Sequence, residues 1–251
     1  MSHDFNGRSA IVTGGGSGIG AAICRQLAAG GATVTVADLD TAGAEAVAHE
    51  ITQSGGSART HIVDTADPAQ VEAMVADAEA AAGALHLLVN NAGIGGTPGP
   101  VGEYPLDDWH NLIGINLNGV FYGMRYALPA IERAGGGAIV NMSSILGSVG
   151  FATAGAYVAA KHGVVGLTKV AAMEYAQHGV RVNAVGPGFI NTPLLEKNLD
   201  AETLQAIARM HPVGRLGTAD EVANLTCFLL SDDAGFITGS YHLVDGGYTA
   251  Q

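Results

Sequence analysis

One tyrosine and one lysine have the spacing of a proton-transfer pair. Lys161 follows Tyr157 by four residues, and the chain has few lysines. Positions i and i+4 of a helix lie on one face, so the phenol and the ammonium can share a site. A neighbouring positive charge lowers a phenol pKa that is about 10 in isolation, which predicts that Tyr157 acts as a general acid and base. The spacing is also consistent with two residues packed on a helix surface.

A glycine-rich turn predicts a dinucleotide site. The stretch TGGGSGIG, residues 13–20, follows a short β-branched run and precedes a helical pattern. Glycines permit the tight turn and the close approach of the backbone to a pyrophosphate, which the free N–H groups of a helix N-terminus bind. Glycines also close ordinary turns, so the strand before the motif and the helix after it are what make it specific.

An acid at the end of the second predicted strand indicates which dinucleotide is bound. Asp38 stands about 20 residues after the glycine-rich turn, where a carboxylate can bind ribose hydroxyls. Its charge would repel the 2′-phosphate of NADP, and no Arg or Lys stands at residues 15–17, 39 or 40 to offset it. The sequence therefore predicts NAD as the cofactor. Asp38 would also suit a cap of the next helix.

Several motifs of this chain resemble the short-chain dehydrogenase/reductase family. The motifs are TGGGSGIG (13–20), NNAG (90–93), Asn116 in INLNGVF, Ser144, YVAAK (157–161) and PGFINTP (187–193). They occur in the family's order and spacing, and together they cover nearly the whole chain. The resemblance implies an NAD-dependent oxidoreductase that interconverts a secondary alcohol and a ketone. It further implies that Tyr157 exchanges the carbinol proton, that Lys161 lowers the Tyr157 pKa and binds the nicotinamide ribose, and that Ser144 hydrogen-bonds the substrate oxygen.

The same resemblance implies the remaining contacts. Asn116 is expected to hold a water that links Lys161 to solvent, and the choice of Ser144 over Ser143 rests on family spacing alone. Asp64 is also consistent with a turn or a helix cap. The expected cofactor contacts lie on the turns after the strands and on the YVAAK helix: Gly14, Ser17, Gly18, Ile19, Asp38, Asp64, Thr65, Asn90, Ala92, Gly93, Tyr157, Lys161, Pro187, Gly188, Ile190 and Thr192.

The expected substrate pocket is apolar. An apolar wall favours a secondary alcohol or ketone with a cyclic or aryl group over a sugar or a carboxylic acid. Such residues are equally consistent with an ordinary core. The segment 189–215 is predicted to be a lid that gates access. The expected pocket residues are Ile94, Ile145, Leu146, Phe151, Phe189, Leu194, Leu195 and Met210.

An α/β fold must position these residues. Short β-branched runs alternate with Ala-rich amphipathic segments, which predicts a single Rossmann-type domain over 1–251 with helices on both faces of a doubly wound parallel sheet. Seven strands are expected at 9–13, 32–37, 58–63, 85–90, 137–142, 180–185 and 241–244. Helices are expected near 18–29, 41–53, 68–81, 107–133, 155–177 and 219–230, the third capped by Asp67 with Pro68 at its first position.

Composition narrows the partners and the location. The net charge of −12, without a basic cluster, disfavours nucleic acid and anionic membranes and favours a small-molecule substrate. No apolar run reaches the roughly 18 residues of a membrane span, and the N-terminus lacks the pattern of a signal peptide. Cys24 and Cys227 have no disulfide or metal spacing, nor do the histidines, so we expect a cytoplasmic protein with reduced thiols and no metal.

The sequence is also consistent with two other functions, and it predicts an oligomeric state. A 3-oxoacyl-carrier-protein reductase would need a basic docking patch and usually uses NADPH. A non-catalytic dinucleotide-sensing protein would be expected to lack one of Asn116, Ser144, Tyr157 and Lys161, which are all present. The segments 107–133 and 155–177 and the stretch YHLVDGGYTAQ resemble the interfaces of family tetramers. A homotetramer is therefore expected, paired through faces carrying Phe121, Val164, Leu167 and Ala171.

Overall fold

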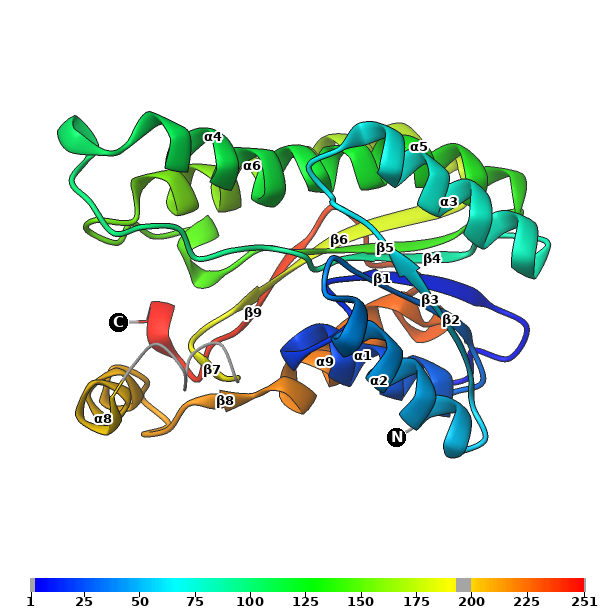
Figure 1. Ribbon diagram of the computed structural model, residues 1–251, viewed down its shortest axis with the longest axis horizontal. Helices are drawn as coiled ribbons and strands as arrows, with labels where there is room; N and C mark the ends of the chain where they lie inside the picture. The colour runs from blue at the N-terminus through cyan, green and yellow to red at the C-terminus, as the bar shows by residue number, and fades with distance from the viewer. Residues whose placement is uncertain (1–2, 193–199, 251) are drawn as a thin grey trace.

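Seven parallel strands form a sheet between two layers of helices in the computed structural model, which describes residues 3–192 and 200–250 (Figure 1). The strand order is β3-β2-β1-β4-β5-β6-β9, with every neighbouring pair parallel. The predicted fold class is thereby confirmed. The strands are β1 (Ser9–Thr13), β2 (Thr33–Asp38), β3 (Ser57–Ile62), β4 (Leu87–Asn90), β5 (Gly137–Met142), β6 (Val180–Pro187) and β9 (Tyr241–Val244).

The central strands are apolar almost throughout because both of their faces are covered. Every residue of β1 and β4 is buried. A parallel sheet that is packed on both sides selects continuous runs of Val, Ile and Leu rather than alternation with polar residues. The predicted strands agree with the observed bounds to within two residues, because these runs are short and are bounded by turn residues.

The helices divide between the two faces of the sheet. Figure 1 shows α1, α2 and α9 on one face and α3, α4, α5 and α6 on the other. One apolar cluster around Ile23, Leu27 and Leu229 fills the first side, and another around Met74 and Ile131 fills the second. The bounds are α1 (Gly18–Ala29), α2 (Thr41–Gln53), α3 (Pro68–Ala82), α4 (Leu106–Ile113), α5 (Gly119–Arg133), α6 (Gly155–Tyr175) and α9 (Ala219–Leu230).

Local capping explains where two of these helices begin. The side chain of Asp67 accepts hydrogen bonds from the N–H groups of Ala69 and Gln70, with Pro68 next to it, as predicted for α3. Thr218 and Glu221 form a reciprocal capping box at the start of α9. Each cap satisfies N–H groups that a helix N-terminus otherwise leaves unpaired.

The long helix predicted over 107–133 is interrupted. A π-helical turn, Gly114–Asn118, joins α4 to α5 and carries the buried Asn116. One extra residue in a turn re-aims the side chains around it and is frequent at functional sites. Sequence periodicity did not predict this turn, because one inserted residue scarcely changes an apolar pattern.

The segment predicted as a lid contains regular structure of its own. Strand β7 (Ile190–Asn191) pairs with β8 (Gly217–Thr218), and helix α8 (Ala201–Arg209) lies between them in the chain. The Asp200 side chain accepts from the N–H of Thr203 and so caps α8. Helix α8 was not predicted from the sequence. Figure 1 places it at one end of the molecule, near the C-terminus.

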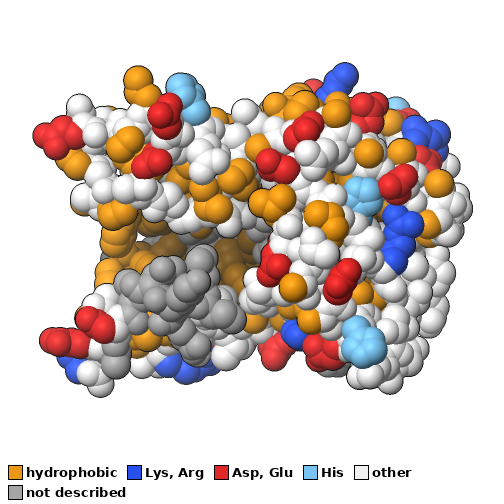
Figure 2. All heavy atoms as spheres, in the orientation of Figure 1, with side chains coloured by type: hydrophobic (Ala, Val, Ile, Leu, Met, Phe, Trp, Pro, Cys, Tyr) orange, Lys and Arg blue, Asp and Glu red, His pale blue; other side chains and the backbone are white. Residues whose placement is uncertain are grey.

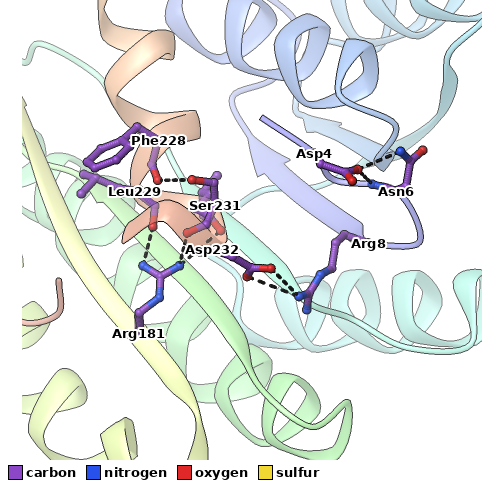
Figure 3. A network of polar contacts seen from close by, with 9 residues as sticks. Asp4, Asn6, Arg8, Arg181, Phe228, Leu229, Ser231 and Asp232 are labelled. Carbon is purple, nitrogen blue, oxygen red and sulfur yellow. Dashed lines mark hydrogen bonds and ion pairs between the residues drawn. The ribbon is translucent and has the colours of Figure 1, made fainter. Parts of the chain in front are cut away.

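An arginine on β6 closes the C-terminal end of α9 (Figure 3). The guanidinium of Arg181 donates to the carbonyl oxygens of Leu229 at 2.6 Å and Ser231 at 2.8 Å. A cation that binds the last carbonyls of a helix also interacts favourably with its dipole. Arg8 and Asp232 form a longer ion pair nearby, at 3.4 Å on the surface. Arg181 therefore connects the C-terminal end of α9 to strand β6 through hydrogen bonds.

Two residues expected on an outward helix face lie in the core instead. Val164 and Ala171 on α6 are buried against the sheet, and Leu167 packs beside them. Phe121 is exposed, as expected, and Val170 and Met173 are exposed on α6. The correction follows from the register of α6, since apolar residues occur on several sides of this helix and composition does not show which of them face the sheet. No helix within the described residues is long and apolar enough to span a membrane.

Candidate active site

The carboxyl ends of the strands surround a cavity of about 620 Å³. Its size lies within the range of roughly 300–1,000 Å³ that is typical of small-molecule and cofactor sites. Figure 2 shows a hollow between the two helical layers on the side of α8, with hydrophobic side chains on its walls. The predicted residues that line it are Gly14, Ser17, Gly18, Ile19, Asp38, Asp64, Thr65, Ala92, Gly93, Ile94, Ser144, Ile145, Leu146, Phe151, Tyr157, Lys161, Pro187, Gly188, Phe189, Ile190 and Thr192.

One end of the cavity has the geometry of a dinucleotide cradle. Gly14 and Gly18 adopt φ values of 63° and 51°, which favour glycine. A Cβ at Gly16 would lie 2.9 Å from both Ala44 N and the Asp38 carboxylate, so only a glycine fits there without displacement. Ser17 occupies the N-cap of α1, but its hydroxyl does not cap the helix. The N–H groups of this helix start can therefore bind a pyrophosphate, and the residues present fit the cofactor.

Asp38 lies at the carboxyl end of β2, on the wall of this cradle. Its Oδ2 accepts from the N–H of Gly16 at 2.8 Å, and its Oδ1 accepts from the N–H of Asp40 at 3.0 Å. These two bonds fix the carboxylate beside the glycine turn. The charged residues among the described lining are Asp38, Asp64 and Lys161, so no guanidinium faces this end of the cavity.

Asp64 makes a turn contact and also lies at the cavity, and its contact with the cofactor remains a prediction. Its Oδ1 accepts from the N–H of Ala66 at 2.9 Å, which is a side-chain turn, and the residue also lines the cavity. Thr65 lines the cavity beside it. A carboxylate bound to its own backbone is held in one orientation, and here that orientation is at the edge of the cradle.

Asn90 is placed differently from expectation, and Asn91 takes its position at the cavity. The Asn90 side chain is buried, and its amide donates to Asn141 Oδ1 at 2.8 Å. Asn91 lines the cavity, and its amide donates to the carbonyls of Thr13 and Gly14 at 3.0 and 3.1 Å. Successive side chains of a strand point to opposite sides, so a shift of one residue moves the site from the core to the cavity.

Ser144 and Tyr157 bring their hydroxyl groups together at the other end of the cavity. Ser144 follows β5, Tyr157 lies in the first turn of α6, and a hydrogen bond joins their side chains. The Ser143 hydroxyl is used elsewhere, because it donates to the Lys161 carbonyl at 3.0 Å. Both serines line the cavity, and the Ser144 side chain is the one next to Tyr157; its contact with the substrate oxygen remains a prediction.

Lys161 is a buried cation behind these hydroxyls. The side chain is only 4% exposed, and its Nζ donates to the carbonyl of Met142 at 2.9 Å. Burial penalises the ammonium and lowers the pKa of Lys161 to about 8. The Nζ atom lies 5.4 Å from the centroid of the Tyr157 ring, so both residues face one site, as the spacing predicted.

The expected lowering of the Tyr157 pKa by Lys161 is wrong for the chain alone. Burial raises the pKa of Tyr157, the hydrogen bond with Ser144 opposes this, and the nearby Tyr241 adds to the increase. The desolvation of the phenolate outweighs the other influences. Without a bound cofactor, Tyr157 is therefore a neutral proton donor at physiological pH.

Asn116 binds the backbone of the cavity wall. Its Oδ1 accepts from the N–H of Ile94 and its Nδ2 donates to the Ile94 carbonyl, both at 2.8 Å. The residue is fully buried within the π-helical turn. This pair of bonds holds Ile94, which lines the cavity. The expected water-holding role remains a prediction.

Aromatic side chains pack around Phe189 on the wall of the cavity. The Phe189 ring lies 6.5 Å from that of Phe151, 5.8 Å from that of His211 and 5.9 Å from that of Tyr248. His211 is buried; its Nδ1 donates to the Ile207 carbonyl and its Nε2 accepts from the Phe189 N–H. This histidine links α8 to the cavity wall, and the sequence analysis did not single it out.

The remaining pocket expectations differ in outcome. Met210 is 39% exposed at the end of α8 and does not line the cavity, because the buried His211 side chain occupies the inward position next to it. Leu194 and Leu195 lie outside the described residues. Sequence reasoning missed further lining residues, namely Leu39, Val63, Asn91, Gly95, Ile115, Met142, Ser143 and Ala154. The sequence feature that could have identified these residues is their position just after a predicted strand or next to a motif residue.

A dinucleotide cradle and a Tyr–Lys–Ser constellation in one cavity define a nicotinamide-dependent oxidoreductase. The family described as Enoyl-(Acyl carrier protein) reductase matches residues 14–249. The chain belongs to the short-chain dehydrogenase/reductase family, and it acts on CH–OH groups. Within the described residues, no three metal-binding side chains are grouped as a metal site would require.

Curated relatives cover the chain from end to end. The cyclohexanol dehydrogenase of Acinetobacter sp. (strain SE19) is 49% identical, over 100% of this chain and 98% of that protein. The cis-4-hydroxycyclohexanecarboxylate dehydrogenase of Sinomonas cyclohexanicum is 45% identical, over 100% of both chains. These relatives favour an alcohol and ketone oxidoreductase over the carrier-protein reductase and the sensing protein.

Solved structures share the fold at similar coverage. The crystal structure of levodione reductase superposes with a TM-score of 0.94 and 36% identity, covering 98% of this chain and 99% of that one. A structure from Agrobacterium tumefaciens with bound NADP has a TM-score of 0.91 and 36% identity, covering 99% and 98%. Because that neighbour holds NADP, the likeness of fold leaves the choice between NAD and NADP to the residues of the cradle.

Proposed function

We propose that this protein is an NAD-dependent dehydrogenase that interconverts a cyclic secondary alcohol and its ketone, with Tyr157 as general acid and base. One observation carries the proposal. The hydrogen-bonded hydroxyls of Ser144 and Tyr157, with Lys161 behind them, open into the same cavity as the Asp38 cradle. A proton donor and a nucleotide site thus line one cavity.

The residues have complementary tasks in this reaction. The nicotinamide supplies or accepts the hydride when it is bound. Tyr157 gives its proton to the oxygen of the ketone, or takes it from the alcohol, and Ser144 donates a hydrogen bond to that same oxygen while charge develops on it. Lys161 places a buried positive charge beside the phenol, which stabilises the phenolate whenever the tyrosine has lost its proton.

Asp38 supports NAD as the preferred cofactor. Its carboxylate is fixed by two backbone N–H groups at the ribose end of the cradle, and the described lining provides no arginine there. A 2′-phosphate would meet this negative charge with no cation to offset it. The ribose hydroxyls of NAD, by contrast, can donate hydrogen bonds to the same oxygens.

The aromatic wall supports a cyclic substrate. The rings of Phe151 and Phe189 pack edge to face on the cavity wall, and Ile94, Ile145 and Leu146 add apolar surface. Flat or puckered hydrocarbon rings bury well against such a wall, whereas a polyol would leave hydroxyl groups without partners. Two relatives are named for substrates that contain a cyclohexane ring.

A substrate panel tests the proposal. Initial rates of NADH or NADPH formation are measured with cyclohexanol, an acyclic polyol and a short hydroxy acid, each with NAD⁺ and with NADP⁺. We expect the highest kcat/KM for cyclohexanol with NAD⁺. Comparable values for the polyol or the hydroxy acid would reject the cyclic substrate, and higher values with NADP⁺ would reject the cofactor assignment.

Four further properties are part of the proposal. A homotetramer is supported by the exposed apolar side chains of Phe121, Val170 and Met173. A mass of one chain in light scattering would reject it. A cytoplasmic location is consistent with the free thiols of Cys24 and Cys227. We also propose a single domain over 1–251 and a lid function for 189–215, supported by the pairing of β7 with β8 beside the cavity.

A further inference from the structure

A second tyrosine approaches the catalytic hydroxyls from the edge of the sheet. Tyr241 is the first residue of β9, and its hydroxyl donates to the backbone carbonyl of Ser144. Ser144 itself follows β5, so this bond passes over the intervening strand β6. Tyr241 does not line the cavity. Its contact is with the peptide that carries the catalytic serine.

Strand β6 has a gap that admits this side chain. A Cβ at Gly186 would overlap the hydroxyl and ring of Tyr241, so the phenol occupies the space that a side chain would need. Glycine is otherwise unfavourable inside a strand, and one found there often marks the close approach of another group. Gly186 and Tyr241 are thus complementary in shape.

The Ser144 carbonyl is the anchor of the turn that orients the serine. It also accepts from the N–H of Gly147 at 2.8 Å, which closes the 3₁₀ turn Ile145–Gly147. Within that turn the N–H of Leu146 donates to Ser144 Oγ at 3.2 Å. The Ser148 hydroxyl, just after the turn, donates to the Ile145 carbonyl at 3.0 Å. The turn is therefore held from outside by one phenol.

We propose that Tyr241 is a positioning residue for the alcohol–ketone reaction: by fixing the Ser144 peptide, it directs the Ser144 hydroxyl toward Tyr157 and the substrate oxygen. The inference rests on the proposed function, because it assigns Ser144 to that oxygen. Misplacing a catalytic group by as little as about 1 Å can reduce the rate strongly. Apart from its electrostatic effect on Tyr157, Tyr241 reaches the site through the Ser144 peptide, and it does not line the cavity that contains the cofactor cradle.

The substitution Tyr241→Phe removes the hydroxyl and keeps the ring in the Gly186 gap. We expect kcat to fall about tenfold, with the KM for NAD⁺ unchanged. Tyr175→Phe is the matched control, because Tyr175 lies at the far end of α6 beside His178, and its kinetics should equal those of the wild type. A change of less than twofold in the kcat of Tyr241→Phe would overturn the proposal.

A double-mutant cycle tests whether the effect passes through the serine. In a Ser144→Ala background there is no hydroxyl to direct, so Tyr241→Phe should cause less than a twofold further loss. A further tenfold loss in that background would show that Tyr241 acts on another group, and the positioning role would be wrong.

Amide hydrogen exchange tests the positioning role of Tyr241 without an activity measurement. The amides of Gly147 and Ser148 are hydrogen-bonded within the turn. In full-length Tyr241→Phe they should exchange at least several-fold faster than in the wild type, while the amides of β1 are unchanged. Equal exchange of the turn would overturn the proposal. If the wild type oxidises no alcohol of the panel, the proposed function fails, and this measurement still stands.

Discussion

The ammonium of Lys161 lies 5.4 Å from the ring centroid of Tyr157, yet burial raises the pKa of the phenol. Both groups are withdrawn from water, and burial lowers the pKa of Lys161 to about 8. The chain therefore keeps an acid and a base side by side, each with its charged form disfavoured. Such a pair favours the neutral phenol, which is the form that protonates a ketone.

Removal of the phenol should stop turnover while leaving the nucleotide site intact. We expect Tyr157→Phe to lower kcat by about 10³, the range of a lost general acid or base, because the ring and its contact with Lys161 remain but no proton can be exchanged. Binding of NAD⁺, followed by calorimetry, should be within about twofold of the wild type. Near-normal turnover would refute the assignment.

Substitution of the acid at the end of β2 should change the cofactor preference. In Asp38→Ala we expect the ratio of kcat/KM for NADP⁺ to that for NAD⁺ to rise by about tenfold or more, because the repulsion of the 2′-phosphate is removed. Asp67→Ala is the control of equal charge, since Asp67 caps α3 away from the cavity. An unchanged ratio in Asp38→Ala would exclude the ribose role.

The buried lysine should reduce the stability of the folded chain. Its pKa falls from 10.5 to about 8, so the charged form costs about 3 kcal/mol on folding. Between pH 8 and 10.5 the unfolded chain binds more protons at Lys161, and stability rises with pH in this window. Lys161→Met lacks this cost, so we expect it to lose activity and to be about 2 kcal/mol more stable at pH 7, after the bond to Met142 is lost.

Urea unfolding at two pH values checks this expectation. The stability advantage of Lys161→Met over the wild type should be largest at neutral pH and should shrink above pH 8, where the wild-type lysine loses its proton. Lys169→Met is the control, because Lys169 is exposed on the same helix and should show no such trend. A difference that is the same at pH 7 and 9.5 would contradict the burial cost.

The hydrogen bonds from Arg181 to the end of α9 should contribute more to the free energy of unfolding than the nearby surface ion pair between Arg8 and Asp232. Arg181→Met removes three hydrogen bonds from a guanidinium to backbone carbonyls, and we expect the free energy of unfolding to fall by about 2–3 kcal/mol. Arg8→Met, which breaks the exposed pair with Asp232, should cost at most about 1 kcal/mol. Equal losses from the two substitutions would argue against the capping role.

The sequence was sufficient wherever the signal is local. Short apolar runs predicted the strands, and glycines between a strand and a helix predicted the cradle. Helical periodicity predicted that Tyr157 and Lys161 face one site. Each of these features is determined by neighbours in the chain. The cavity accordingly contains most of the residues predicted for it.

The sequence was insufficient wherever tertiary packing decides. Asn90 and Asn91 are adjacent and chemically identical, and only their positions at and just after the end of β4 assign one to the core and the other to the cavity. The sign of the Tyr157 pKa shift depends on how much water burial removes, which spacing does not contain. The His211 bridge and the Tyr241 contact join segments that lie far apart in the chain.

Strand β9 is the last of the seven to leave a ribosome. The Ser144 carbonyl, on the turn after β5, therefore meets its phenol partner only when this last strand has joined the sheet. The edge strand thus links completion of the sheet to the arrangement of the serine turn.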